Sequence, residues 1–300
     1  MIDLSIIIVN YNVKQFVLDC LASVYKYNDI SGIEIIVVDN NSLDGSVAAI
    51  LEKFPKVIVI ENKFNAGFPA ANNQGFKIAQ GKYIFMLNPD TEITDHALTK
   101  LYNYMENNAQ TDMLAPMLLN TDLSVQSSVW RYPTLWNIFC EIHYLKVFLR
   151  YKNYKDKDFS NPFEADSFSG AAIFFKKEIF SKIGMLDESM FWIEDVDFCF
   201  RAKQAGMKLL YFPDAKVLHH IGQSAKKNYN VSLSNQIFNK IKFFKKYKSK
   251  IKYFAVVVLS VYHVVIKLLI FCILSPVRKV YWRKAKAYFY ILTQLLNPAL

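Results

Sequence analysis

The sequence lacks the cysteine pattern of a disulfide framework or of a metal site. Its four cysteines stand far apart and show no ligand spacing, so we expect reduced, mostly buried thiols in a protein of the cytosolic side: Cys20, Cys140, Cys199 and Cys272. No secretory signal peptide is expected either, because an apolar strand pattern begins at Leu4, within a few residues of Met1.

A glycine-rich loop is also missing where two classes of α/β protein would need one. The first apolar run, Leu4–Val9, is followed by Asn10-Tyr11-Asn12. A nicotinamide-dependent oxidoreductase would carry Gly-x-Gly-x-x-Gly at this point, and a sugar-phosphate nucleotidyltransferase a loop rich in glycine and arginine. The sequence argues against both classes. The nucleotidyltransferase stays as an alternative because it shares the α/β layout.

Acidic residues are absent between Lys240 and Lys252, a stretch that holds seven lysines. The segment from Arg278 to Lys286 adds five cations, and the net charge of the chain is +10. Such an uneven distribution indicates an anionic partner for the C-terminal part, either a lipid surface or nucleic acid. We expect no nucleic-acid partner, because these lysines interleave with a long apolar run instead of forming a solvated face.

That apolar run, Phe254–Leu274, is about as long as a membrane-spanning helix, for which roughly 20 residues suffice. Ser260, His263 and Lys267 recur at helical spacing and give it one polar stripe. Both flanks are basic, whereas a single span normally keeps its cations on one side. We therefore favour a helix lying in the membrane interface, with a single transmembrane helix as the alternative.

Short apolar runs alternate with helical stripes over the first 110 residues. This alternation predicts βαβ units, right-handed crossovers and a mostly parallel sheet flanked by helices. Strands are expected at the β-branched and apolar runs, and the intervening segments carry apolar residues at helical spacing. The runs are 4–9, 33–38, 57–60 and 83–87.

The strand Tyr83–Leu87 ends in Asn88-Pro89-Asp90, where proline cannot continue a sheet ladder. An open parallel sheet binds ligands just beyond the carboxyl ends of its strands. Asp90 is therefore placed either as an oxygen ligand of a divalent cation or as a plain turn residue. The second strand ends similarly in Asp39-Asn40-Asn41-Ser42, a cluster that offers a ligand-facing carboxylate and an N-cap for the next helix.

Four segments together resemble the inverting family 2 glycosyltransferases of the GT-A fold. Their closest likeness is to the rhamnosyltransferase-like branch that builds bacterial cell-surface polysaccharides. The resemblance runs from about Leu4 to Ser224, in the family's order, and includes later segments such as Gln126–Pro133, Trp192–Arg201 and Tyr211–His219. The four segments are Ile6–Asn12, Val37–Ser42, Asn65–Phe68 with Asn72-Asn73, and Leu87–Thr91.

The resemblance implies a GT-A, Rossmann-like domain over 1–235, with a nucleotide-binding half at 1–115 and an acceptor half at 116–235. Residues 236–300 would form a helical, membrane-associated appendage. The segment Leu135–Pro162 has no clear period, and we interpret it as a variable insertion near the acceptor.

Family members hold the nucleotide with residues whose counterparts here are polar strand ends and turns. The resemblance implies that Asp39 accepts from N3–H of a uracil or thymine ring, with simple helix capping as the alternative. The nucleotide-binding set implied in this way is Val9, Asn10, Asn12, Asp39, Asn65, Gly67, Asn72 and Asn88. For Asn12, Asn65 and Gly67 a plain turn role is equally open.

Asp90 would coordinate Mg²⁺ or Mn²⁺ bridging the two phosphates, as the resemblance implies. Asn88 stands where the fuller Asp-x-Asp motif has its first carboxylate, which implies a weaker metal site or one dependent on substrate phosphates. His219 resembles the histidine that completes this site in some relatives, but a structural role is equally open. His220 is a less favoured substitute.

Asp195 is the expected general base for the acceptor hydroxyl, because relatives carry it in this Glu-Asp segment at a helix start. Glu194 is the rival, and solvated carboxylates at the front of a helix are the alternative to both. Trp192 and Trp130 could stack on sugar or base, although core packing is the commoner role of an aromatic side chain.

The function implied is inverting transfer of a sugar from a UDP- or dTDP-linked donor, with dTDP-rhamnose as one candidate. The acceptor would be a glycan or a lipid-linked saccharide at the cytoplasmic face of the membrane, with the enzyme peripheral or anchored by a single span. A catalytically silent membrane scaffold is the rival from another class. Retention of Asp39, Asp90 and Asp195 together argues against it.

Overall fold

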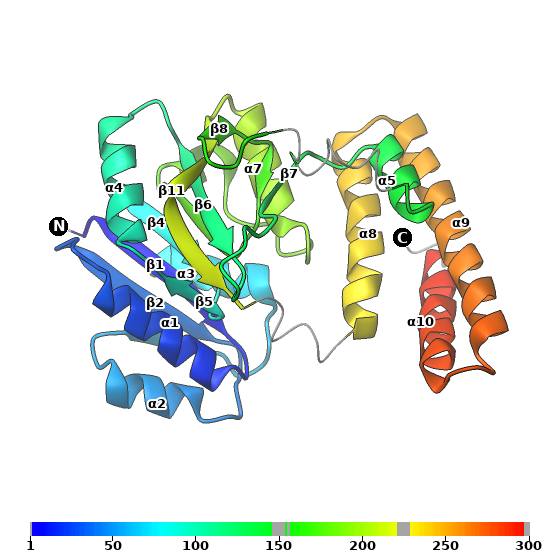
Figure 1. Cartoon of the computed structure of the whole chain (residues 1–300), viewed down its shortest axis with the longest axis horizontal. Coiled ribbons are helices and arrows are strands. Elements are labelled where there is room, and N and C mark those ends of the chain that lie inside the picture. The colour runs from blue at the N-terminus through cyan, green and yellow to red at the C-terminus, as the bar shows by residue number, and fades with distance from the viewer. Residues whose placement is uncertain (1, 146–153, 155–156, 221–228, 297–300) are drawn as a thin grey trace. The chain divides into compact units, whose positions relative to one another are not determined.

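The computed structural model describes residues 2–145, 154, 157–220 and 229–296 (Figure 1). The chain divides into two compact units, Met1–Tyr132 with Tyr151–Lys227, and Pro133–Arg150 with Asn228–Leu300. The functional division expected between 235 and 236 falls inside a helix of the second unit, and it stays a prediction.

The N-terminal half of the first unit forms four parallel strands in the order β3-β2-β1-β4. All residues of β1 and β4 are buried, as expected for central strands without a solvent face. The bounds are β1 Leu4–Asn10, β2 Ile33–Asp39, β3 Ile58–Glu61 and β4 Tyr83–Leu87.

The sheet continues beyond β4 with β10 (Ala172–Lys176), which runs antiparallel to both β4 and β6 (Met113–Leu119). Next to β6 lies β11 (Leu209–His219), parallel to it and followed by the antiparallel β5 (Thr91–Ile93). Smaller strands are β8 (Phe163–Glu164) on β11, and the separate pair β7 (Val129–Trp130) and β9 (Ser167–Phe168).

Helices cover both faces of this sheet because successive side chains of each strand point to opposite sides. Ile6 and Ile8 of β1 pack in one core cluster with residues of α1, α2 and α4, whereas Ile7 and Val9 pack in another with residues of α3, α6 and α7. The bounds are α1 Lys14–Lys26, α2 Ser46–Lys53, α3 Phe68–Ile78, α4 Ala97–Asn107, α6 Ile179–Ile183 and α7 Glu194–Gln204. This arrangement confirms the expected α/β architecture.

The helix cap expected in the Asp39–Ser42 cluster is wrong. Helix α2 begins at Ser46, after Gly45 in the left-handed conformation with φ 74°. The carboxylate of Asp44 accepts a hydrogen bond from the backbone N–H of Ser46 at 3.1 Å. The cluster ends too early in the chain to cap this helix, because a loop of three further residues separates it from Ser46.

The second unit is helical and consists of α5 (Leu135–Ile142), α8 (Tyr229–Tyr247), α9 (Lys250–Leu274) and α10 (Lys279–Leu295). Helix α9 packs against each of the other three. Part of the expected irregular insertion is therefore a regular helix, α5, whose partner lies more than a hundred residues further along the chain.

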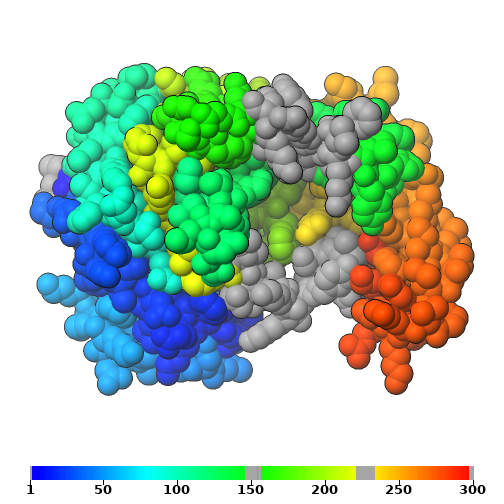
Figure 2. All heavy atoms as spheres, in the orientation of Figure 1, coloured from blue at the N-terminus to red at the C-terminus, as the bar shows by residue number. Residues whose placement is uncertain are grey.

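The polar stripe of α9 faces the interior of this unit. Ser260 and Lys267 are buried, and Lys267 Nζ donates to the Tyr144 hydroxyl and lies 4.1 Å from the centre of its ring. Apolar side chains of the same helix are exposed instead, among them Phe254 and Leu269. Figure 2 shows the orange and red atoms of α9 and α10 at the surface. Among the described residues, α9 is the one helix long and apolar enough to cross a membrane.

Candidate active site

The strand register places the polar ends of β1 and β2 side by side. Asn10 is the register partner of Asp39, and Ile8 of β1 is the partner of Leu87, the last residue of β4. Three parallel strands therefore end together, and the residues that follow them meet at the carboxyl edge of the sheet.

Asp39 is 2% exposed, and both of its carboxylate oxygens accept hydrogen bonds. Asn10 Nδ2 donates to Oδ1 at 2.7 Å, and the backbone N–H of Ser42 donates to Oδ2 at 2.8 Å. A carboxylate can accept about four hydrogen bonds, so this network orients Asp39 and leaves acceptor capacity for a ligand N–H.

Asn12 closes the turn after β1, in the left-handed conformation with φ 54°. Its backbone N–H donates to Ser42 Oγ at 2.9 Å, and its side-chain oxygen accepts from the backbone N–H of Leu43 at 2.8 Å. Val9 is buried in the core cluster on the α3 face, so its side chain contributes to the packing that holds the end of β1 in place.

Asn40, which directly follows β2, links the end of that strand to the loop before α3 by hydrogen bonds. We did not single out this residue from the sequence. Its side-chain oxygen accepts from Asn62 Nδ2 at 2.9 Å and from the backbone N–H of Ala66 at 3.3 Å. Gly67 has φ 86°, and its N–H donates to Asn65 Oδ1 at 2.9 Å. A side chain at position 67 would be strained in this conformation, which explains the glycine.

Asn72 on α3 is 1% exposed and donates through Nδ2 to the Phe68 carbonyl at 3.0 Å. Its Oδ1 has no hydrogen-bond partner within the described part of the chain. The neighbouring Asn73 is structural, because its amide both donates to and accepts from the backbone of Leu186, at 2.9 and 3.0 Å.

A backbone bridge joins the end of β4 to the start of α7. The N–H of Asn88 donates to the Ala171 carbonyl at 2.8 Å, and the N–H of the preceding residue, Gly170, donates to Asp195 Oδ2 at 2.8 Å. The expected base Asp195 and the expected metal ligand Asp90 are thus brought to one end of the sheet. The Oδ1 atom of Asn88 is buried and has no partner among the described residues.

The two acids at the start of α7 lie in different surroundings. Asp195 keeps part of its surface exposed and accepts from the backbone N–H groups of Gly170 and Val196. Burial raises the pKa of Asp195 to about 6, although these N–H groups oppose the rise. Burial and the charge of Asp195 also raise the pKa of Glu194, which is 8% exposed. A carboxylate that titrates near neutrality suits proton transfer.

Asp90 and His219 approach each other at this edge, with His219 Nε2 3.4 Å from Asp90 Oδ1. Gln126 orients the imidazole: its Nε2 donates to Asn120 Oδ1 and to the His219 carbonyl, so its Oε1 accepts from His219 Nδ1 at 2.7 Å. A proton held on Nδ1 leaves the Nε2 lone pair directed to the Asp90 side, which is the arrangement of a metal-binding histidine.

The donor set fits a divalent cation that substrate oxygens also coordinate. Within the described residues, no group of three or more His, Cys, Asp and Glu side chains could hold a metal ion. Mg²⁺ binds proteins through one or two carboxylates plus substrate phosphates, so two protein donors are sufficient for such a site. His220, the less favoured substitute, is engaged elsewhere, because its Nε2 lies 2.6 Å from Glu92 Oε1.

Two aromatic side chains beside Asp195 are exposed, Phe191 at 36% and Trp192 at 38%. Trp192 has φ 82°, a conformation that costs free energy for a bulky residue and is typical of functional sites. Core packing is therefore not the role of Trp192. Trp130, on β7, is half-buried. The resemblance extends to about Ser224, but residues 221–228 lie outside the described part of the chain.

The fold and this edge define the class of protein: an α/β protein with a Rossmann-like sheet whose acidic residues gather at the carboxyl ends of the strands. The sequence pattern of glycosyl transferase family 2 matches residues 5–184, more than half of the chain. The protein belongs to glycosyl transferase family 2.

Two relatives illustrate the likeness in sequence. The low-salt glycan biosynthesis hexosyltransferase Agl10 of Haloferax volcanii is 27% identical over 214 residues, which cover 69% of this chain and 64% of that protein. The N-acetylglucosaminyl-diphospho-decaprenol L-rhamnosyltransferase of Mycobacterium tuberculosis is 26% identical over 214 residues, 64% of this chain and 68% of that protein. The chain thus spans less than two thirds of the length of the first of them.

A solved structure shows the likeness in fold. It is the mannosyltransferase PcManGT from Pyrobaculum calidifontis, in complex with GDP-Man and Mn²⁺. The superposition has a TM-score of 0.59 at 14% identity and covers 96% of this chain and 84% of that chain. This likeness confirms the fold class expected from the sequence.

Proposed function

We propose that this protein transfers a sugar, with inversion, from a UDP- or dTDP-linked donor to a glycan or a lipid-linked saccharide in surface polysaccharide synthesis. The observation that supports the proposal is the position of three acids at the same edge of the sheet. Asp39 is placed there by its register with Asn10, and Asp90 and Asp195 by the bridge through Ala171 and Gly170.

The nucleotide part of the donor is assigned to the ends of β1 and β2 and the loop before α3. Asp39 accepts from the N3–H of a uracil or thymine ring with the capacity that its two protein hydrogen bonds leave. The other residues assigned to the nucleotide are Val9, Asn10, Asn12, Asn65, Gly67, Asn72 and Asn88. The side-chain oxygens of Asn72 and Asn88 are buried without a hydrogen-bond partner among the described residues, and we assign them to donor groups of the ligand.

Asp195 is assigned as the general base. It accepts the proton of the acceptor hydroxyl as that oxygen attacks the anomeric carbon opposite the diphosphate. The N–H groups of Gly170 and Val196 fix its orientation, and near pH 7 it is ionised while the pKa of Glu194 is higher still. Trp192 supplies an exposed ring on which a sugar can stack.

Asp90 Oδ1 and His219 Nε2 are the donors that would hold Mg²⁺ or Mn²⁺. The cation, when bound, would neutralise charge that develops on the leaving diphosphate. Gln126 contributes indirectly by keeping His219 in the tautomer that can bind a metal. The presence of Mn²⁺ in the mannosyltransferase structure supports this assignment.

The proposal is tested by incubating the full chain with UDP- and dTDP-linked sugars, with Mg²⁺ or Mn²⁺, and measuring thermal stabilisation and sugar transfer. A bound nucleotide sugar raises the melting temperature in proportion to the logarithm of its concentration. dTDP-rhamnose belongs in this panel because the Mycobacterium tuberculosis relative is named as an L-rhamnosyltransferase. Absence of stabilisation by every member, in the presence of metal, would contradict the proposed donor class.

The activity should fall as the pH is lowered through about 6, because a base must be ionised and the pKa of Asp195 is raised to that value. An ordinary aspartate would titrate at about 3.9. The acid limb of kcat/KM against pH measures this directly. The Glu194→Gln variant should keep the same limb, because protonated glutamate and glutamine are both neutral; loss of the limb in that variant would identify Glu194 as the base.

The second unit is assigned to the cytoplasmic face of a membrane. Helix α9 buries its polar stripe and exposes apolar side chains, the reverse of a helix on a water-soluble surface. Basic segments flank it and would attract anionic headgroups. A lipid-linked acceptor, as named for the Mycobacterium tuberculosis relative, would be presented at such a surface.

We expect the full chain to sediment with vesicles that contain phosphatidylglycerol. Replacing Phe254 and Leu269 by glutamate, at positions 69% and 57% exposed, should lower the bound fraction about tenfold or more, because charge is costly at an apolar lipid boundary. Leu43→Glu is the matched control, since Leu43 is 88% exposed in the first unit. Equal sedimentation of all variants would contradict the assignment, and alkaline extraction separates a surface helix from a span.

A further inference from the structure

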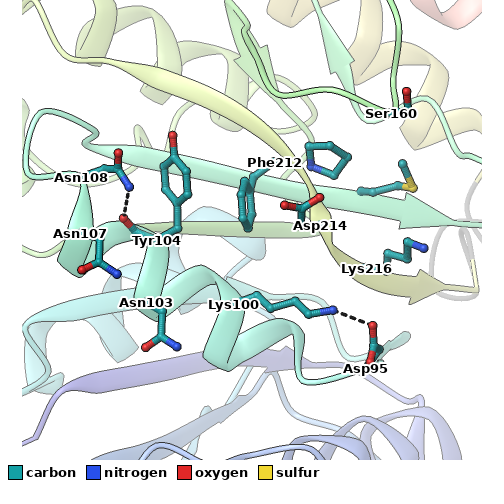
Figure 3. A pocket seen from close by; sticks show the side chains of 12 residues that line it. Asp95, Lys100, Asn103, Tyr104, Asn107, Asn108, Ser160, Phe212, Asp214 and Lys216 are labelled. Carbon is teal, nitrogen blue, oxygen red and sulfur yellow. Dashed lines mark hydrogen bonds and ion pairs between the residues drawn. The ribbon is translucent and has the colours of Figure 1, made fainter.

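The first unit contains a cavity of about 710 Å³ between helix α4 and strand β11 (Figure 3). Its volume lies in the range of small-molecule sites. None of the residues assigned above to the donor, the metal or the base lines it. Its walls are a polar stripe of α4 on one side and the irregular middle of β11 on the other.

The α4 stripe recurs at helical spacing and is separate from the face that packs in the core. Lys100, Asn103, Tyr104 and Asn107 line the cavity, at positions i, i+3, i+4 and i+7. The buried residues of α4 are others, namely Ala97, Leu98, Leu101 and Met105. Asn103 and Asn107 are exposed, so two amides are presented to the cavity without a packing role.

Strand β11 forms the opposite wall where its pairing with β6 is irregular. The register shifts between Phe212 and Lys216, and the intervening Pro213 and Asp214 line the cavity. The ring of Phe212 lies 4.6 Å from that of Tyr104, centre to centre, at 45°. Figure 3 shows the two rings side by side. It also shows the side-chain amides of Asn103 and Asn107 on α4 and that of Asn108 at the C-terminal end of this helix.

The charges that line the cavity balance. Lys100 Nζ lies 2.6 Å from Asp95 Oδ2, and Lys216 and Asp214 add one charge of each sign. Hydrogen bonding and charge from Lys100 keep the pKa of Asp95 below its ordinary value, so this carboxylate is ionised at neutral pH. A cavity without net charge does not favour a phosphate or a polyanion.

We propose that this cavity, the α4–β11 groove, binds a neutral oligosaccharide. Amide and carboxylate side chains match hydroxyl groups that both donate and accept hydrogen bonds. The half-buried ring of Tyr104, which packs against the buried ring of Phe212, supplies an apolar surface for the C–H face of a sugar ring. Balanced charge selects uncharged sugars.

Strand β11 connects the groove to the candidate active site. Lys216 precedes His219 by three residues of strand, or about 10 Å at the rise of an extended chain. A saccharide in the groove is therefore placed as the distal part of the acceptor, which lets the enzyme engage a chain of several sugars. This last step rests on the proposed function, whereas binding of the saccharide does not.

The test is saturation-transfer NMR of the full chain with maltotriose and chitotriose as neutral probes and tri-galacturonate as the anionic probe. We expect binding of a neutral trisaccharide at millimolar concentration. The double variant N103A/N107A should weaken it about tenfold or more, through the loss of two amides. Alanine favours the helix, so the variant should fold. Gln110→Ala, an exposed amide just beyond α4 that does not line the groove, should bind normally.

Three results would overturn the proposal: no binding of either neutral trisaccharide, equal binding by N103A/N107A and the unchanged protein, or preference for tri-galacturonate. The same titration with Asp195→Asn separates this inference from the proposed function. Saccharide binding that persists in a variant without transferase activity supports the groove. Normal transfer by Asp195→Asn would contradict the assignment of the base alone. Transfer to a long acceptor, but not to a monosaccharide acceptor, should decline in N103A/N107A.

Discussion

The Asp195→Asn variant should lose transfer activity by a factor of roughly 10² to 10⁴, the usual contribution of a general base. Asparagine has the same shape and still accepts one of the two hydrogen bonds from Gly170 and Val196, but it cannot take a proton. Nucleotide affinity should stay nearly unchanged, because Asp195 lies on α7 and the nucleotide is assigned to β1, β2 and the loop before α3. Initial rates under saturating donor, with calorimetric titration of the nucleotide, measure both quantities.

Glu194→Gln is the matched control for this variant. It removes the neighbouring carboxyl group of the same helix turn by an equally conservative change, and its expected effect on the rate at pH 7 is small. A normal rate in Asp195→Asn would show that Asp195 is not the base. A large loss in Glu194→Gln combined with a small loss in Asp195→Asn would reverse the two roles.

The parallel half of the sheet was predictable because its signals are local. Buried strands such as Tyr83–Leu87 read as continuous apolar runs, and the structure has this strand at the same bounds. Proline in Asn88-Pro89-Asp90 ends the strand by its own chemistry. The helix start expected at Glu194-Asp195 is observed, because α7 begins at Glu194.

The antiparallel insertion of β10 between β4 and β6 was not predictable in the same way. Its five residues read as a strand, but its partners precede it by more than fifty residues, and no local pattern specifies the pairing. The helix α5 escaped prediction for a related reason. Its apolar face packs on α9 in the second unit. The spacing of apolar residues within Leu135–Pro162 alone cannot reveal such a distant partner.

The candidate site shows the same limit at the level of single side chains. The residue types at Asp39, Asp90 and Asp195 were recognisable, whereas the groups that orient them were not. Gln126 sets the tautomer of His219 from 93 positions away, and Gly170 orients Asp195 through its backbone, which carries no side-chain signal. The cap expected in the Asp39–Ser42 cluster failed because helix α2 begins only at Ser46, where Asp44 accepts from the backbone N–H.

Asp90→Ala should abolish most of the metal-dependent affinity for UDP or dTDP. The protein offers few donors here, since within its described residues no larger group of acidic, histidine and cysteine side chains could hold a cation. Loss of one of two protein donors should therefore weaken nucleotide binding in Mn²⁺ by about 100-fold or more, above the roughly 10- to 100-fold typical of losing an outer-shell partner. Calorimetric titration with Mn²⁺, with Mg²⁺ and with chelator measures this loss.

Three further variants decide how the site is built. His219→Ala removes the second metal donor. Gln126→Leu leaves both donors in place but removes the hydrogen bond that fixes the tautomer of His219. We therefore expect a smaller loss of nucleotide affinity in Gln126→Leu, within about 10-fold to 100-fold. Glu92→Gln is the control, because this nearby carboxylate pairs with His220. In chelator, all of these proteins should bind the nucleotide equally weakly. If the unchanged protein binds UDP and dTDP with the same affinity in chelator as in Mn²⁺, then Asp90 and His219 do not form a metal site, and leaving-group charge must be met by other groups of the protein.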